Sequence, residues 1–212
     1  MKNYAVAVIV FTAVIFLSCK NNNKVEVKDG KISTTDAIQA AETITREASA
    51  AKDRWEARRA KGDTMALPYK ELEAFLPAVS GYTKDGSPKG SQMNMPGMGS
   101  WSQTEQQYVN GDKRVKVTII DYNASQMAFS GATALYKMGF SAEDDTRKQG
   151  SVDLGVKDAA AYETIYKQQP EAQLTVIAGD RFFINLESNG SNDIELLKSA
   201  AKNVLSGLSS KY

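Results

Sequence analysis

Residues 101–122 read WSQTEQQYVNGDKRVKVTIIDY, and this stretch decides the kind of fold that the chain forms. From Val115 to Ile119 apolar residues alternate with polar ones, and a period of two is the pattern of a half-buried β-strand. Asn110-Gly111 is the dipeptide that a type I′ hairpin turn favours. The stretch therefore predicts two antiparallel strands, 101–109 and 112–122, joined by a turn at Asn110-Gly111.

A two-residue turn at this place also predicts the register of the pair. It sets Gln106 opposite Val115 and, on the other face, Glu105 opposite Lys116, an ion pair across the two strands. Strand 112–122 then has one apolar face, whereas its partner has little apolar surface to offer. We therefore expect 101–109 towards an edge of the sheet.

A second hairpin is predicted nearer the C-terminus, with strands 172–178 and 181–188 and a turn at Gly179-Asp180. Its apolar residues are expected as Ile177, Phe182, Ile184 and Leu186 on one face and Leu174, Val176 and Phe183 on the other. A strand that is apolar on both faces is covered on both faces. Further strands are expected near 150–156 and 159–168.

Helices are predicted over 36–62, from Pro68 to Pro77, over 124–138 and over 192–208. The first is expected to be a stalk with heptad-spaced alanines, although a surface helix docked through Ile44 and Trp55 is favoured over a coiled coil. The last has a cap predicted at Asn192 and Glu195. Residues 81–100, rich in Gly, Ser, Pro and Met, predict a loop with some extended structure.

This order of elements predicts an α+β domain over 63–212, with a mainly antiparallel sheet and helices packed on it. It resembles the Mog1/PsbP-like architecture, which several bacterial lipoproteins adopt. A likeness of fold does not by itself imply a function. Residues 67–122, with LPYKELEAFLP and YVNGDKRVKVTIIDY, also resemble a group of uncharacterised bacterial envelope proteins, and that resemblance brings no catalytic residues with it.

The N-terminus predicts export. An apolar run from Tyr4 to Leu17 is shorter than the roughly 20 residues of a spanning helix and has the length of a signal-peptide core. Phe16-Leu17-Ser18-Cys19 resembles the lipobox of bacterial lipoproteins. The resemblance implies a signal peptide at 1–18, lipid on Cys19, a flexible tether over 19–35 and an envelope domain that faces the periplasm.

Composition excludes several classes of protein. Cleavage before Cys19 removes Lys2, so the 26 basic residues of the chain become 25, equal to its 25 acidic residues. A neutral chain lacks the basic excess that nucleic-acid binding needs. The sequence has no histidine, and Cys19 is its only cysteine. Ser-His-Asp and Cys-His catalysis, ordinary zinc sites and disulfides are therefore excluded.

Three methionines in one short segment suggest a metal site. Met93, Met95 and Met98 carry thioethers, which are ligands for soft ions such as Cu(I). Methionine also fills gaps on apolar surfaces, so packing or a flexible contact loop is the favoured interpretation of this segment. Copper handling remains the first alternative function.

Two further patterns are weaker indications of a catalytic site. Ser199 and Lys202 match the S-x-x-K of serine acyl-enzymes, but without its companion motifs. Asp144-Asp145 offers neighbouring carboxylates and is better interpreted as a solvated loop. A hydrolase that uses either pattern is the second alternative function.

Aromatic residues suggest a binding surface. Tyr162 and Tyr166 share one face of a predicted strand, and Trp101 lies close in sequence to the methionines. These three side chains are candidates for a ligand or partner groove, with core packing as the competing interpretation. The sequence thus predicts a non-enzymatic envelope lipoprotein without a cofactor, which binds a protein or small molecule or has a structural role.

Overall fold

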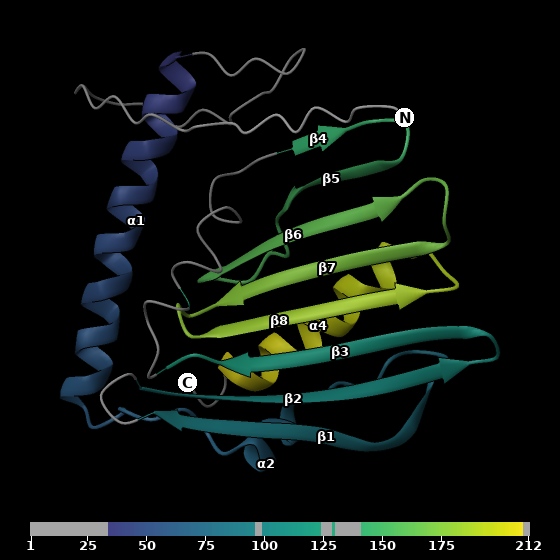
Figure 1. Ribbon diagram of the computed structural model, residues 1–212, viewed down its shortest axis with the longest axis horizontal. Coiled ribbons are helices and arrows are strands. Elements are labelled where there is room, and N and C mark those ends of the chain that lie inside the picture. The colour runs from purple at the N-terminus through teal and green to yellow at the C-terminus, as the bar shows by residue number, and fades with distance from the viewer. Residues whose placement is uncertain (1–33, 96–98, 124–128, 130–140, 210–212) are drawn as a thin grey trace, which may run out of the picture.

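The computed structural model describes residues 34–95, 99–123, 129 and 141–209. Within them an eight-stranded sheet has the order β1-β2-β3-β8-β7-β6-β5-β4 (Figure 1). The strands are β1 (Thr83–Met95), β2 (Gly99–Asn110), β3 (Lys113–Asp121), β4 (Ser141–Glu143), β5 (Arg147–Val152), β6 (Ala159–Tyr166), β7 (Glu171–Ala178) and β8 (Phe182–Asn189). The helices are α1 (Thr34–Ala60), α2 (Tyr69–Leu72), the 3-10 helix η1 (Glu73–Phe75) and α4 (Ile194–Ser209). The predicted α+β class with an antiparallel sheet is confirmed.

The sheet consists of two meanders that meet at one junction. Strands β1 to β3 form the first meander and β4 to β8 the second, and each neighbouring pair within them is consecutive in the sequence. β3 and β8 join the two, pairing antiparallel from Arg114 opposite Asn189 to Asp121 opposite Phe182. The two halves of the sheet are therefore held together along a single pair of strands.

The core lies on one face of this sheet. α4 crosses behind the central strands in Figure 1. Its buried residues Leu197, Val204 and Leu205 belong to one apolar cluster with Val176 and Ile184 of the sheet. Burial of each such side chain contributes about 1.5–3 kcal/mol. Asp193 caps the start of the same helix, since its Oδ1 accepts a hydrogen bond from the Leu196 amide at 3.1 Å. The cap predicted at Asn192 is therefore wrong by one residue.

The first hairpin was placed correctly, but its register was wrong by two residues. Gly111, with φ +58°, and Asp112 form the turn, because glycine then occupies the first central position that a type II′ turn requires. Gln106 lies opposite Val117 and Glu105 opposite Thr118. The predicted pair of Glu105 with Lys116 does not form. A shift of two keeps every side chain on its predicted face.

The second hairpin differs from its prediction by one residue. Ala178 lies opposite Phe182, so Gly179, Asp180 and Arg181 all belong to the turn. A shift of one moves a whole strand to the other face. The predicted division of apolar residues between the faces is therefore wrong.

Both strands of this hairpin place most of their apolar residues on the core face. Leu174 and Val176 of β7 share that face with Ile184 and Leu186 of β8, while Ile177 lies opposite Phe183 on the other face. At the turn end this second face is covered, since Ile177 is buried. Farther from the turn it carries polar, half-buried side chains, including Gln173 and Glu187.

Residues 83–95 form an edge strand, where a loop with some extended structure was predicted. β1 pairs with β2 from Thr83 to Met95, and the register shifts between Asp85 and Lys89, around Pro88. Proline is tolerated at such a bulge on an edge strand. The extended structure expected within 81–100 is thus far longer than predicted, because backbone pairing with β2 holds the whole segment. Strand β2 is therefore second from the edge.

Of the other elements predicted from the sequence, some are confirmed and one lies outside the described residues. The predicted strands near 150–156 and 159–168 correspond to β5 and β6, and the helix between Pro68 and Pro77 is confirmed as α2 with η1. β4 was not predicted. The helix predicted over 124–138 lies outside the described residues except for Phe129. Among the described helices, none is both long and apolar enough to cross a membrane.

Gly90 of β1 permits the close approach of α2, which gives a test of this packing. A Cβ at position 90 would lie 3.0 Å from the Gln103 carbonyl oxygen and would overlap the ring of Tyr69. We expect Gly90→Ala to lower the free energy of unfolding by about 1–3 kcal/mol through overpacking. Urea denaturation measures this loss, with Ser91→Ala as the neighbouring control. In a Tyr69→Ala background the loss should be much smaller; an unchanged loss would show that the ring is not the obstacle.

Candidate functional site

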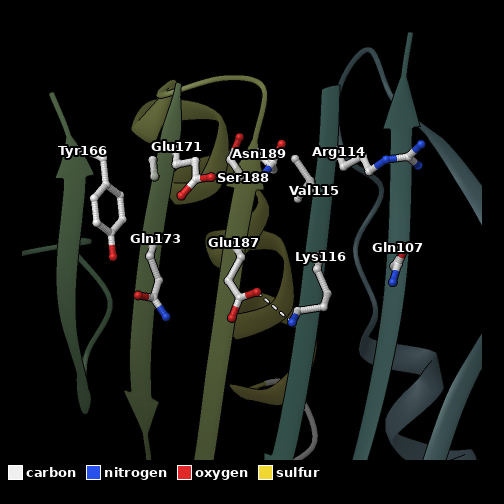
Figure 2. A pocket seen from close by; sticks show the side chains of 11 residues that line it. Gln107, Arg114, Val115, Lys116, Tyr166, Glu171, Gln173, Glu187, Ser188 and Asn189 are labelled. Atoms are coloured by element: carbon white, nitrogen blue, oxygen red, sulfur yellow. Dashed lines mark hydrogen bonds and ion pairs between the residues drawn. The ribbon is translucent and has the colours of Figure 1, made fainter. Parts of the chain in front are cut away.

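The face of the sheet opposite α4 carries a polar groove (Figure 2). It has a volume of about 390 Å³ and extends across strands β2, β3, β8, β7 and β6. One line of side chains crosses it in register, with Gln107 beside Lys116, Lys116 beside Glu187 and Glu187 beside Gln173. Because alternate residues of a strand point to one face, the apolar core behind these strands and the polar groove in front of them use the same segments.

Charges in the groove are balanced in number, and each has a polar or charged partner. Lys116 Nζ lies 2.7 Å from Glu187 Oε2 in its centre. Arg114 Nη1 lies 3.5 Å from Asp85 Oδ2, and Glu171 Oε1 accepts a hydrogen bond of 3.1 Å from Asn189 Nδ2. Two cations and two carboxylates line the groove itself, so its formal charge is zero.

This arrangement offers hydrogen bonds rather than activated groups. The amide of Asn185 donates to Glu187 Oε1 at 2.7 Å, so this carboxylate has both a cation and an amide as partners. A nucleophile needs an adjacent base that activates it, and the polar side chains of the lining are carboxylates, amides, cations, one phenol and the hydroxyl of Ser188. Ser188 is buried and donates its hydroxyl proton to the Ser191 carbonyl oxygen at 2.8 Å. Among the described residues, His, Cys, Asp and Glu nowhere gather in a group of three that would suit a metal ion. The geometry suits the binding of a polar ligand.

The structure brings two of the three predicted aromatic residues together. Tyr166 lines the groove, and Tyr162 lies on the same strand, opposite Thr175. Trp101 lies on β2, opposite Met93. Four strand spacings separate β2 from β6, about 19 Å. Trp101 also lies six residues from Gln107 along β2, about 20 Å, and it does not line the groove. All three residues are half-buried.

Of the predicted thioether ligands, the structure describes one side chain. Met93 is 46% exposed near the end of β1. The side chain of Met95 and the whole of Met98 lie outside the described residues, as does Cys19. The Cu(I) site remains a prediction from the sequence.

The two patterns considered for hydrolysis lie on the surface. Ser199 and Lys202 are exposed on α4. Asp144 Oδ1 accepts hydrogen bonds from the Thr146 hydroxyl at 2.6 Å and from the amides of Thr146 and Arg147 at 2.7 and 2.9 Å. These bonds, with that of the Thr146 hydroxyl foremost, lower the pKa of Asp144 to about 2. Asp144 thus stabilises the turn between β4 and β5.

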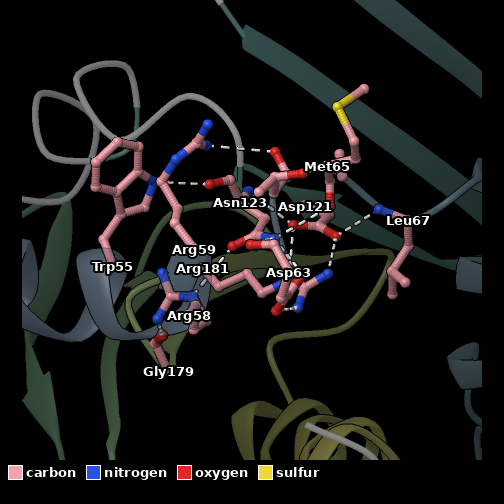
Figure 3. A network of polar contacts seen from close by, with 12 residues as sticks. Trp55, Arg58, Arg59, Asp63, Met65, Leu67, Asp121, Asn123, Gly179 and Arg181 are labelled. Carbon is pink, nitrogen blue, oxygen red and sulfur yellow. Dashed lines mark hydrogen bonds and ion pairs between the residues drawn. The ribbon is translucent and has the colours of Figure 1, made fainter. Parts of the chain in front are cut away.

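A buried ion pair lies at the other end of the central strands (Figure 3). Arg181, 2% exposed, donates from Nε and Nη2 to the two carboxylate oxygens of Asp121 at 3.0 and 2.8 Å, and Asp121 is fully buried. The same carboxylate accepts the backbone amides of Leu67 and Asn123, each at 2.8 Å. Each oxygen of this buried carboxylate thus meets two donors, as burial of charge requires.

The ion pair continues towards α1. Arg181 Nη1 lies 2.9 Å from Asp63 Oδ2. Arg58 of α1 donates to Asn123 Oδ1 at 3.1 Å and to the Gly179 carbonyl at 3.2 Å. Burial, followed by the charge of Arg181, lowers the pKa of Arg58.

Aromatic and amide contacts complete this attachment. The indole of Trp55 donates to the carbonyl oxygen of Asn123 at 2.9 Å, and the Asn123 side-chain amide donates to Asp63 Oδ1 at 2.6 Å and to the Met65 carbonyl at 3.1 Å. Asn123 is 1% exposed. The C-terminal half of α1 is thereby attached to the junction of β3 and β8.

Sequence reasoning did not find this network. Asp121 follows an apolar strand and Arg181 follows a Gly-Asp turn, and both positions are ordinary places for surface charges. Only the pairing of β3 with β8 brings the two residues together. The sequence feature that corresponds to this network is one acidic and one basic residue at the ends of two strongly apolar strands. That feature alone does not indicate that the two residues pair.

Comparisons with known proteins give no family. No family model matches the chain, and no curated protein matches it. Among solved structures, the extracellular domain of PknH from Mycobacterium tuberculosis is similar, with 11% sequence identity and a TM-score of 0.40, over 69% of this chain and 93% of that one. At this distance the likeness carries no functional argument.

Separation of the buried pair should cost much of the stability of the domain. Arg181→Met leaves the Asp121 carboxylate buried without its cation, so we expect the free energy of unfolding to fall by about 3–5 kcal/mol in urea denaturation. Asp121→Asn combined with Arg181→Met should cost less than the two single changes together, because no charge is then left alone.

The matched control for that experiment is Arg114→Met. Arg114 and Asp85 are 57% and 51% exposed, and exposed pairs contribute about 0–1 kcal/mol. Equal losses for Arg181→Met and Arg114→Met would contradict the role given to the buried pair.

Proposed function

We propose that this protein is a lipid-anchored lipoprotein of a bacterial envelope and that its domain is a non-enzymatic binding module. The observation that carries the proposal is the neutral, polar groove opposite α4. Its central residues Lys116 and Glu187 are 37% and 41% exposed. A ligand can therefore reach them without any opening of the core.

The absence of histidine and of a second cysteine from the sequence supports binding over catalysis. Glu171 and Glu187, the carboxylates of the groove, already have hydrogen-bond or ionic partners. The groove can instead hold a ligand by several hydrogen bonds at once.

The anchor rests on the lipobox at Phe16-Leu17-Ser18-Cys19. Stable membrane attachment needs more than one acyl chain, and a lipoprotein carries a diacylglyceryl group on its cysteine sulfur. α1 then lies between the tether and the domain. A helix from Thr34 to Ala60 spans about 40 Å at 1.5 Å per residue, so it provides reach as well as attachment.

Loss of the lipid should release the protein from the membrane. In cells that process lipoproteins, we expect wild-type chain in the membrane pellet and Cys19→Ala in the soluble fraction, because the thiol is the site of acylation. Incorporation of labelled fatty acid into the wild type alone is the companion measurement. A Cys19→Ala chain that still sediments with membranes would overturn the lipid anchor.

Photocrosslinking tests the binding function. A photoreactive phenylalanine analogue at position 107, on the rim of the groove, should give an adduct in intact cells that is detectable by mass spectrometry. The same analogue at position 202, on the exposed side of α4, is the matched control. An adduct from position 107 that is missing from position 202 supports binding at the groove. The same products from both positions, or none from either, would contradict it.

A further inference from the structure

We infer that the groove binds an uncharged glycan, laid across β7, β8, β3 and β2. This inference rests on the proposed binding function and assigns a ligand class to that site. Four properties of the groove support it: its charge balance, the hydrogen-bonding capacity of its side chains, the burial of its aliphatic side chains and its length.

Charge balance argues against an ionic ligand. Lys116 and Glu187 neutralise each other at 2.7 Å in the centre of the groove, and Arg114 lies near Asp85 at its margin. An anionic ligand would have to break one of these pairs and leave a carboxylate without its counter-charge. A cationic ligand would meet only Glu171 outside these two pairs, and this carboxylate already accepts a hydrogen bond from Asn189. An uncharged ligand can lie on the pairs without separating them.

Hydroxyl groups suit both members of such a pair. An ammonium group has three donors, an ionised carboxylate has about four acceptor sites, and a hydroxyl both donates and accepts. One sugar hydroxyl can therefore accept from Lys116 while the next donates to Glu187. Gln107 and Gln173, at the two ends of the same line of side chains, add amide donors and acceptors for further hydroxyls or for an acetamido group.

The aliphatic side chains that line the groove offer a ligand almost no exposed surface. Val115 and Ala172 line it, but they are 0% and 2% exposed, and Tyr166 contributes the one aromatic ring. Peptides and apolar small molecules gain most of their affinity from buried apolar contacts. An extended peptide also cannot add as a strand here, because the backbones of β3, β8 and β7 are paired on both sides. A polyhydroxylated ligand needs neither buried aliphatic contacts nor a free strand edge.

The length of the groove suits a short chain of sugars. The line from Gln173 through Glu187 and Lys116 to Gln107 crosses three strand spacings, about 14 Å. Such a span is longer than a single hexose. An oligosaccharide should therefore bind more tightly than its monomer.

Calorimetric titration of the full chain, purified in detergent, tests the ligand class. The probes are three uncharged tetrasaccharides (chitotetraose, cellotetraose and maltotetraose), an anionic tetragalacturonate and a Gly-Ser octapeptide. We expect at least one uncharged tetrasaccharide to bind, at least tenfold more tightly than its monosaccharide and than either of the other probes. Failure of all three uncharged probes would overturn the assignment.

A charge-neutral double variant locates the binding. Lys116→Met with Glu187→Gln removes the central pair, and loss of hydrogen bonds to charged groups should weaken tetrasaccharide binding at least tenfold. The pair is partly exposed, so the fold should persist, which circular dichroism verifies. Lys52→Met with Glu56→Gln removes an exposed pair of the same type on α1 and should leave binding unchanged. Equal affinity in both double variants would overturn the assignment.

The outcomes separate the ligand class from the binding function. Tetragalacturonate or the octapeptide, if bound preferentially and lost with the Lys116/Glu187 variant, would overturn the assignment to an uncharged glycan while supporting the groove as a binding site. A position-107 adduct that contains protein and no sugar would do the same. If no probe binds and position 107 gives no specific adduct, the binding function itself fails.

Discussion

The buried pair of Arg181 and Asp121 is the interaction on which the rest of the structure depends. It lies where β3 ends and β8 begins, so it fastens the two meanders at their junction. A buried charge is tolerated only when it is paired and hydrogen-bonded, and therefore Arg181 has to remain in the turn. As the third turn residue it sets the register of β8 against β7. Register in turn decides which side chains face the core.

The groove is a consequence of that register. With Ala178 opposite Phe182, β8 directs Ile184 and Leu186 into the core and presents Glu187 on the other face. A shift of one residue would exchange these faces and bury Glu187 beneath α4. The register that buries the apolar residues thus also determines which polar residues line the groove. Along these strands, residues that line the groove alternate with residues that stabilise the core.

Much of the fold was predictable from local patterns, whereas the site was not. Alternation in 112–122 and the turn residues near 110 and 179 located both hairpins, and the periodicity of 192–208 located α4. Turn length decided the registers, and in the second hairpin it depends on Arg181, whose partner is distant in sequence. β1 has no apolar pattern because its place at the edge comes from backbone pairing with β2. Tyr166 was found as an aromatic candidate, but the lysine and glutamate of the groove resembled ordinary surface charges.

The attachment of α1 has a mechanical consequence. Arg58 and Trp55 are bound at the end of the sheet where Asp121 lies, while Arg114, at the groove, is seven residues back along β3, about 23 Å away. With the chain tethered at Cys19 as proposed, a pull between the membrane and a bound ligand would load β3 lengthwise. Its ladders of hydrogen bonds to β2 and β8 would then share the force in shear. If the anchor and the ligand act at these two ends, β3 carries the load with a paired strand on each side.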